Sequence, residues 1–164
     1  MDFLENAITE LASTPERVEK LVQGLSESQQ AWKPSPELFS VRESVFHLRD
    51  IEIEGYSKRL RMVLTEECPL LPDINGGRLA RERNYNAQPT APAMADLRRS
   101  RASSVELLKK CSASDLARKA EMPDVGVIDL RRLLELWMKH DRGHLADIAE
   151  VRRAVESRES AVVD

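Results

Sequence analysis

The chain has 164 residues, 41% of them hydrophobic and 32% charged, with a formal net charge of −3, and this length predicts one domain with a single core. Acidic and basic residues are interspersed, which argues against a nucleic-acid or anionic-membrane partner. The acidic N-terminal sequence MDFLENAITE and the lack of a long apolar run argue against a signal peptide or a membrane span, so we expect a cytoplasmic protein.

A first helix is predicted over about residues 2–24, where apolar residues recur at helical spacing. Pro15 follows Ser13 and Thr14 inside this segment. Because proline is tolerated in the first turn of a helix but disrupts its interior, the sequence STPER predicts either a kink or a restart. The proline-containing segment KPSPELF then predicts a loop.

A second helix is predicted from about Val41 to Thr65. Ser40 and Glu43 have the spacing of a capping box, which favours a helix that begins at Val41 and makes a contact between Glu43 and His47 the less favoured interpretation. His47 lies in the second turn of this helix. Its inward side is indicated by Leu48, Ile51, Gly55 and Met62.

The longest irregular stretch, CPLLPDINGGRLARERNYNAQPTAPA, has four prolines and a Gly-Gly pair. A connection of this length is typical of a functional loop or of a crossover between two parallel helices. Arg78, Arg81, Arg83 and Tyr85 within it could contact an anionic substrate, although solvated loop side chains are the more common outcome for such residues.

A third helix is predicted over about Pro92–Lys110, followed by a capped turn and a loop in SASDLARKAEMPDVGV, with almost no strand signal along the chain. The fourth helix is predicted to begin near Asp129, a good N-cap, and to end near Glu156. The sequence therefore predicts an all-α four-helix bundle. We expect one domain over residues 1–157 and a frayed tail over residues 158–164.

The fourth predicted helix contains WMKHDRGHLADI, with two of the three histidines of the chain. At about 100° per residue, His140 and His144 fall in the middle of its apolar stripe. A buried imidazole needs a hydrogen-bond partner or a metal ion, and histidines four residues apart can bind one ion. His47 could meet them across the bundle, but periodicity alone does not establish this, and histidines that are merely hydrogen-bonded in the core stay an alternative. The stripe comprises Leu133, Trp137, His140, His144, Ile148, Val151 and Val155.

Carboxylates near these histidines are weaker candidates for chemistry. Asp141 follows His140, but it is shorter than the glutamate of an HExxH metalloprotease and no further ligand of that type follows, which disfavours a protease. Asp141 and Asp147 could orient ligands or form salt bridges. Asp50 and Glu54, one and two turns beyond His47, are, with Asp141, the candidates for a general base. Cys68 and Cys111 lack a CxxC pattern and are expected to be free thiols.

The segment FSVRESVFHLRD, followed about 90 residues later by HDRGHLADI, resembles the DinB family of DinB/YfiT-like metalloenzymes, and the similarity extends over nearly the whole chain. The family pattern is aromatic-Ser/Thr-x-x-Glu-x-x-x-His-Leu, then His-Asp-x-x-His-Leu. Phe39 stands where the family more often has Trp, and Arg101 also looks like the family. The matching residues are Phe39, Ser40, Glu43, His47 and Leu48, then His140, Asp141, His144 and Leu145.

This resemblance implies an up-down-down-up bundle with a long connection between helices two and three, a metal held by His47, His140 and His144, and a homodimer. Three imidazoles leave an open coordination position, for which zinc is the first choice and nickel, iron or manganese are alternatives. The implied activities are transfer of a low-molecular-weight thiol such as bacillithiol or mycothiol, thiol-dependent isomerisation, or hydrolysis.

The sequence therefore favours a metal-dependent enzyme that activates a thiol or water towards a small electrophilic substrate. The alternative is a non-catalytic, stress-related dimeric binding module with a structural or vestigial metal site. An open coordination position beside a pocket favours the enzyme. A triad without a cavity beside it favours the binding module.

Overall fold

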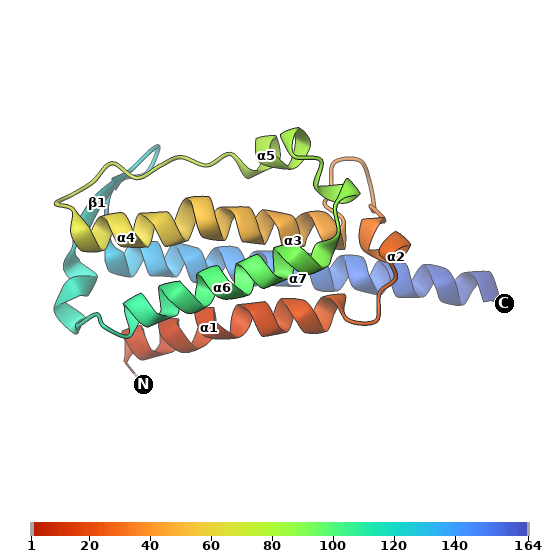
Figure 1. Ribbon diagram of the computed structural model, residues 1–164, viewed down its shortest axis with the longest axis horizontal. Coiled ribbons are helices and arrows are strands. Elements are labelled where there is room, and N and C mark those ends of the chain that lie inside the picture. Colours follow the sequence, from red (N-terminus) through yellow and green to blue (C-terminus); the bar gives the residue numbers. More distant parts are fainter. Residues whose placement is uncertain (1, 164) are drawn as a thin grey trace.

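Apolar residues at helical spacing form four long helical segments that lie side by side (Figure 1). The computed structural model describes residues 2–163, and it describes side chains as far as residue 158. Among these residues, no helix is long and apolar enough to cross a membrane. The four segments are α1 (Phe3–Val22), the run of α3 (Val41–Asp50), η1 (Ile51–Tyr56) and α4 (Ser57–Thr65), then α6 (Thr90–Leu108) and α7 (Leu130–Val163).

The predicted topology is confirmed. Helix α1 packs against α6 and α7, and α3 packs against the same two helices from the other side. In Figure 1, α1 and α7 run in one direction while the α3–α4 run and α6 run in the opposite one. Two consecutive segments are therefore parallel, and the long connection between them crosses the length of the bundle, which gives the up-down-down-up order.

Two predicted helix caps agree with the observed helix bounds, and one internal proline does not. The capping box at the start of α3 is confirmed, because the Ser40 hydroxyl accepts the Glu43 N–H at 3.0 Å and the Glu43 carboxylate accepts the Ser40 N–H at 2.9 Å. Asp129 caps α7 by accepting the Arg132 N–H at 2.8 Å. Pro15 lies inside α1, which continues to Val22, so the predicted restart is wrong.

The second segment is not one regular α-helix, because Ile51–Tyr56 form a π-helix between α3 and α4. A π-turn accommodates an extra residue, which rotates the following side chains by about 100° relative to a regular helix. On the predicted inward side, Leu48, Ile51 and Gly55 are buried, whereas Met62, which follows the π-helix, is only partly buried. Glu52, within the π-helix, is buried with 1% of its surface exposed. A constant helical period could not predict this change of face.

Several short elements depart from the sequence predictions. The long connection contains α5 (Gly76–Glu82) and the 3-10 helix η2 (Tyr85–Ala87), and α2 (Glu27–Ala31) precedes the proline-containing loop. The predicted loop after α6 contains the 3-10 helix η3 (Ala113–Ala117). It continues as an antiparallel hairpin of β1 (Lys119–Met122) and β2 (Gly126–Asp129), so the prediction of almost no strand is wrong there. The strand sequence KAEM holds no β-branched or aromatic residue, which explains the weak signal.

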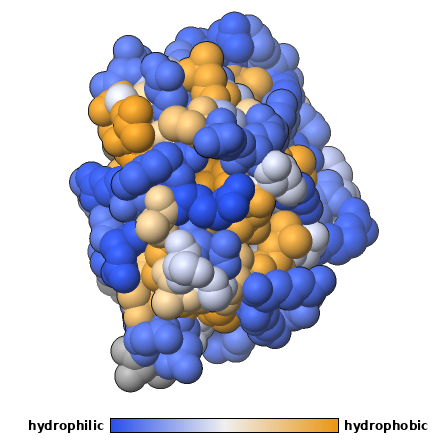
Figure 2. Space-filling model, turned by 90° about the vertical axis from the view of Figure 1, so that its left-hand side faces the viewer, coloured by the Kyte–Doolittle hydropathy of each residue, from blue (hydrophilic) through white to orange (hydrophobic). Residues whose placement is uncertain are grey.

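Helix α7 continues to Val163, past its predicted end at Glu156, so that bound was too short. The last residue of the predicted frayed tail, Asp164, lies outside the described residues. At the other end of α7, exposed apolar side chains gather near the hairpin, namely Leu70, Val125 and Val127, which are 64%, 57% and 66% exposed. Figure 2 faces this end and shows hydrophobic residues among hydrophilic ones.

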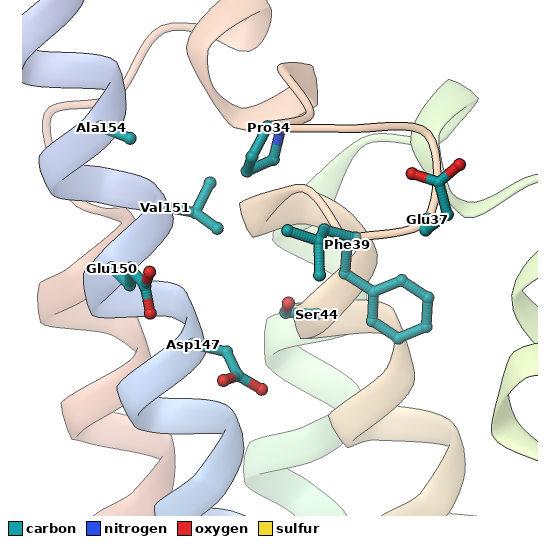
Figure 3. A pocket seen from close by; sticks show the side chains of 9 residues that line it. Pro34, Glu37, Phe39, Ser44, Asp147, Glu150, Val151 and Ala154 are labelled. Carbon is teal, nitrogen blue, oxygen red and sulfur yellow. The ribbon is translucent and has the colours of Figure 1, made fainter.

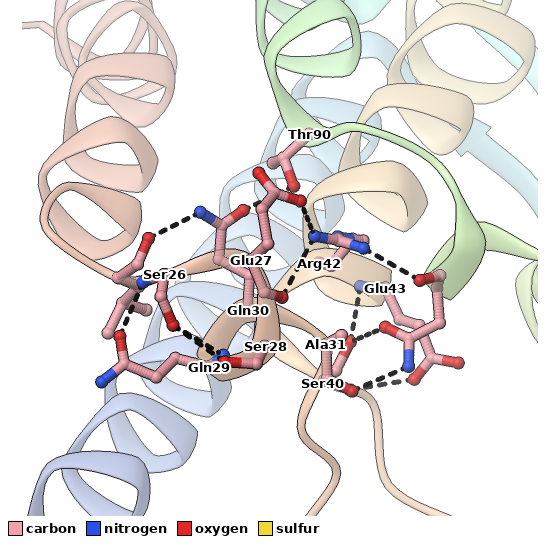
Figure 4. A network of polar contacts seen from close by, with 12 residues as sticks. Ser26, Glu27, Ser28, Gln29, Gln30, Ala31, Ser40, Arg42, Glu43 and Thr90 are labelled. Atoms are coloured by element: carbon pink, nitrogen blue, oxygen red, sulfur yellow. Dashed lines mark hydrogen bonds and ion pairs between the residues drawn. The ribbon is translucent and has the colours of Figure 1, made fainter.

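Polar contacts hold α2 and the start of α3 to the end of the long connection (Figure 4). The Arg42 guanidinium pairs with Glu27 and donates to the Asn86 carbonyl oxygen at 3.0 Å. The Thr90 hydroxyl donates to the Gln30 side chain at 2.7 Å. These contacts fix the helix that carries His47 relative to the loop that covers it.

A polar layer divides the core of the bundle into two apolar clusters. One cluster includes Trp137 and Met138 of α7, and the other includes Leu145 and Ile148 of the same helix. Trp137 is fully buried, as predicted for a core residue. Both histidines of the motif lie between these two pairs, so they occupy the middle of the bundle.

Candidate metal centre

The three histidines of the chain meet between α3 and α7. The Nε2 atoms of His47 and His140 are 3.2 Å apart. The ring centroid of His144 lies 4.4 Å from that of His47 and 4.6 Å from that of His140. Each ring offers one nitrogen such that these nitrogens all lie within 4.8 Å of one another. The structure thus brings together the three residues that the sequence singles out.

Two of the three histidines, His47 and His144, are neutral at physiological pH. Burial, followed by the proximity of the other two rings, lowers the pKa of His47 to about 3. Burial also lowers the pKa of His144 to about 4, with His140 as the next cause. Each neutral imidazole presents one nitrogen lone pair, which is the form that binds a metal.

Two imidazole nitrogens lack hydrogen-bond partners. The Nδ1 atoms of His47 and His144 are buried and have no hydrogen-bond partner among the described residues. The carboxylate of Asp147 approaches Nδ1 of His144, but the 3.6 Å separation is longer than a hydrogen bond. Buried polar atoms are normally paired. The histidine cluster departs from this rule, because two of its ring nitrogens are unpaired.

A glycine in the long connection lies directly against His47. A Cβ atom placed on Gly76, the first residue of α5, would be 2.3 Å from Cε1 and 2.6 Å from Nδ1 of that ring. No real side chain fits at this distance, so α5 can cover the histidine only because residue 76 is glycine. The Gly-Gly pair was visible in the sequence, but nothing in its spacing connected it with His47.

Asp141 links the histidine cluster to a buried ion pair. Its Oδ1 lies 3.3 Å from Nδ1 of His140, and its Oδ2 accepts from Arg101 at 2.8 Å. Burial alone would raise the pKa of Asp141, but the Arg101 guanidinium and the His140 N–H outweigh it and lower that pKa. An ionised Asp141 accepts the Nδ1–H of His140, which leaves the Nε2 lone pair facing His47. Of the two roles left open for Asp141, the salt bridge between helices is confirmed, and its contact with His140 is compatible with the other, the orientation of a ligand.

Arg101 is the centre of this ion pair and is only 2% exposed. Its Nε and Nη2 donate to Glu52 at 3.0 and 2.8 Å, and its Nη1 also donates to the Leu11 carbonyl oxygen at 2.7 Å. Glu52 did not appear among the sequence candidates, although it lies one helical turn after the buried Leu48.

The other candidate bases lie in contacts away from the histidines. Asp50 accepts from the Tyr85 hydroxyl and from Arg83, and Glu54 pairs with Arg83 at 2.5 Å. Among the described contacts, neither carboxylate touches a histidine of the cluster. Tyr85 is 1% exposed, so treating it as a solvated loop residue is wrong, whereas Arg78 and Arg81 are exposed as that interpretation predicts.

Aromatic rings shield the histidine cluster on two sides. The Tyr56 ring stacks on Trp137, with centroids 5.1 Å apart, and lies 5.4 Å from the His140 ring. The Phe39 ring lies 5.5 Å from His47. Phe39 matched the sequence motif, whereas Tyr56, the last residue of the π-helix, was not among the sequence candidates.

A cavity of about 420 Å³ adjoins the cluster between α7 and the segment before α3 (Figure 3). Two of its lining residues touch the cluster, since Phe39 lies against His47 and Asp147 lies against His144. None of the three histidines lines this cavity, so Phe39 and Asp147 connect the histidine cluster to a space of the size of a small organic molecule.

Comparisons with known proteins agree with this geometry. A model of the DinB superfamily matches residues 10–148. "Putative metal-dependent hydrolase BH0277" of Halalkalibacterium halodurans is 25% identical over 143 residues, which cover 87% of this chain and 82% of that protein. "Putative metal-dependent hydrolase OB0782" of Oceanobacillus iheyensis is 26% identical over 113 residues, covering 69% of this chain and 64% of that protein.

The bundle is also similar to a solved structure, that of YfiT from Bacillus subtilis, described as a probable metal-dependent hydrolase with an unusual four-helix bundle topology. The TM-score is 0.85 and the sequence identity 23%, over 93% of this chain and 87% of that one. At this identity the likeness establishes the fold.

Proposed function

The chain belongs to the DinB superfamily, and from this premise we propose that it is a metal-dependent hydrolase whose divalent ion is held by His47, His140 and His144. The observation that carries the proposal is the convergence of three imidazoles, each of which offers a nitrogen within 4.8 Å of the others, close to a cavity. The names of the curated relatives support the reaction class.

The donor set fits such an ion. Two ligands of a tetrahedral zinc ion at 2.0–2.1 Å are about 3.3 Å apart. The Nε2 atoms of His47 and His140 are separated by 3.2 Å. Three nitrogen donors without a fourth protein ligand are typical of catalytic zinc sites, and imidazole also suits nickel or iron and, less well, manganese.

The chemistry that a divalent ion supplies in such a site is Lewis-acid activation of water or of a thiol. The residues of the chain prepare for it. Asp141 holds the proton of His140 at Nδ1 and so directs the Nε2 lone pair towards the other two rings. Phe39 and Tyr56 exclude bulk water from the flanks of the cluster. A low-molecular-weight thiol is the alternative nucleophile that the family resemblance implies.

Elemental analysis of protein purified without a histidine tag tests the metal proposal. We expect about one divalent ion per chain in the wild type and almost none in the variant with His47→Ala, His140→Ala and His144→Ala. A variant with Cys68→Ser and Cys111→Ser is the matched control, because it removes both thiols and should keep the ion. Equal metal content in the wild type and the triple histidine variant would contradict the site.

Hydrolysis is tested on the same preparations with 4-nitrophenyl butyrate as a generic ester. We expect chelator-treated wild type to lose turnover and to regain it with zinc, and the triple histidine variant to show no zinc response. A zinc response that is equal in both proteins would contradict a role of the cluster. The predicted small-molecule substrate and homodimer are part of the proposal, and sedimentation of the purified protein checks the dimer.

A further inference from the structure

The cavity beside the histidine cluster has an apolar body. It lies between α7 and the segment that leads into α3, and its volume of about 420 Å³ is within the usual range of small-molecule sites. The apolar side chains that line it are Pro34, Leu38, Phe39, Val151 and Ala154. Such a surface favours the hydrocarbon part of a ligand.

Every charged residue that lines the cavity is acidic, namely Glu37, Asp147 and Glu150. In Figure 3, Asp147 and Glu150 project from α7, and Glu37 lies on the opposite side, beyond Phe39. Hydrogen bonds from Ser35 and from the backbone lower the pKa of Glu37, so this carboxyl is ionised. The lining therefore holds three carboxylates on two sides.

Cations close to the cavity do not neutralise these carboxylates. Lys33 precedes the lining residue Pro34. Its ammonium pairs with Glu43 at 3.1 Å, and its charge contributes only the smallest of the causes that lower the pKa of Glu37. Among the described residues, Glu150 has no ion pair, and Asp147 pairs with no lysine or arginine and lies only near His144. Without a bound metal ion, the field in the cavity is therefore negative.

We propose that this cavity binds the apolar part of a substrate that carries a permanent or protonated ammonium group, and that it disfavours anionic substrates and thiols that carry carboxylates. The inference rests on the proposed function for the reaction and specifies its substrate class. A cation gains from three nearby carboxylates and from the face of Phe39, whereas an anion is repelled. The ammonium group would lie near Asp147 and Glu150, and the reacting bond would lie towards the histidine cluster.

Three probes of equal chain length test the charge preference: hexyltrimethylammonium, hexan-1-ol and hexanoate. The quaternary ammonium cannot ligate a metal, and titrations followed by NMR are made on both metal-free and zinc-loaded protein. In the metal-free protein we expect the ammonium to bind about fivefold tighter than the alcohol, and hexanoate to bind most weakly. The preference should shrink as ionic strength rises.

A pair of charge-neutralising variants locates the effect. Glu150→Gln should weaken ammonium binding about two- to fivefold and leave the alcohol unchanged. The matched control is Glu67→Gln, which removes an exposed carboxylate just after the end of α4, at the opposite end of the bundle, and should change neither affinity.

The outcomes separate the two proposals. Equal affinity for the three probes, tighter binding of hexanoate to the metal-free protein, or equal effects of the two variants would overturn the substrate class. If zinc is bound by the histidines but no ammonium preference is found, only this inference fails. If the ammonium preference is found without zinc uptake, the pocket assignment holds and the proposed hydrolase function fails.

Discussion

Two polar groups lie side by side in the middle of the bundle and differ in burial and in how their atoms are paired, since the His140 and His144 side chains are 19% and 21% exposed. The ion cluster comprises Arg101, Glu52 and Asp141, and protein atoms accept from all three guanidinium nitrogens of its arginine. The histidine cluster comprises His47, His140 and His144, and it keeps two buried nitrogens without a hydrogen-bond partner among the described residues. Asp141 belongs to the first cluster and contacts the second.

This difference in pairing distinguishes polar groups that stabilise the fold from polar groups that are available to bind a ligand. A fully paired ion cluster fixes the positions of the helices that it joins, and removing one member leaves a buried charge without compensation. A cluster with free lone pairs is costly to bury and is retained where a ligand pairs with them. The ion cluster, whose guanidinium is fully paired, thus holds the histidine cluster in position. We call the ion cluster closed and the histidine cluster open.

The largest effect is expected from opening the closed cluster. Arg101→Met should lower the free energy of unfolding by about 3–5 kcal/mol, because Glu52 and Asp141 lose their common partner. His144→Ala, in metal-free protein, should cost less than about 2 kcal/mol. Urea denaturation of both variants measures the contrast. A smaller loss of unfolding free energy for Arg101→Met than for His144→Ala would contradict the structural role of the ion cluster.

Zinc should stabilise the open cluster only. At a free concentration of 100 times its dissociation constant, the ion should raise the unfolding free energy of the wild type by about 2.7 kcal/mol. The triple histidine variant should not respond, and a chelator should reverse the gain. Thermal unfolding with and without zinc gives the result, and a shift of equal size in both proteins would place the ion elsewhere.

Gly76→Ala should disturb the histidine cluster, because Gly76 of the long connection lies against His47. The new Cβ would overlap with the His47 ring, so we expect a loss of about 1–3 kcal/mol in unfolding free energy and weaker zinc binding. Gly143→Ala is the matched control, since no heavy atom lies within 4 Å of its Cβ and alanine favours a helix. If His47→Ala removes most of the Gly76→Ala penalty in a double-mutant cycle, the contact is the cause. Additive losses would contradict it.

Asp141→Asn tests the link between the clusters. Loss of the charge that orients His140 should weaken zinc binding about 10- to 100-fold, as seen for other groups that orient metal ligands. Asp147→Asn should have a smaller effect, because its carboxylate is 65% exposed and 3.6 Å from His144. Competition with a chromophoric chelator measures both affinities. Equal losses would mean that Asp141 has no special role.

The sequence predicted the parts of this molecule that follow from local rules. Apolar spacing placed the four long helices, the capping box at Ser40 and the cap at Asp129 are confirmed, and the stripe on α7 located both of its histidines. The DinB resemblance supplied the topology and the partnership with His47. These features depend on residues a few positions apart or on a shared motif.

The remaining features depend on contacts between distant segments, which no local pattern encodes. Glu52 pairs with Arg101 across 49 positions of the sequence, and a constant period cannot reveal the π-helix at Ile51–Tyr56. Gly76 meets His47 only after the long connection folds back across the bundle. The acidic cavity likewise joins residues before α3 to residues of α7, which are separated by more than half of the chain.

The central claim is that three imidazoles of one chain hold a catalytic ion with an open position. Zinc K-edge X-ray absorption of zinc-loaded, tag-free protein tests it most directly. We predict three imidazole nitrogens and one further light ligand at about 2.0–2.1 Å. A sulfur ligand at about 2.3 Å, or an unchanged spectrum in the triple histidine variant, would contradict the claim.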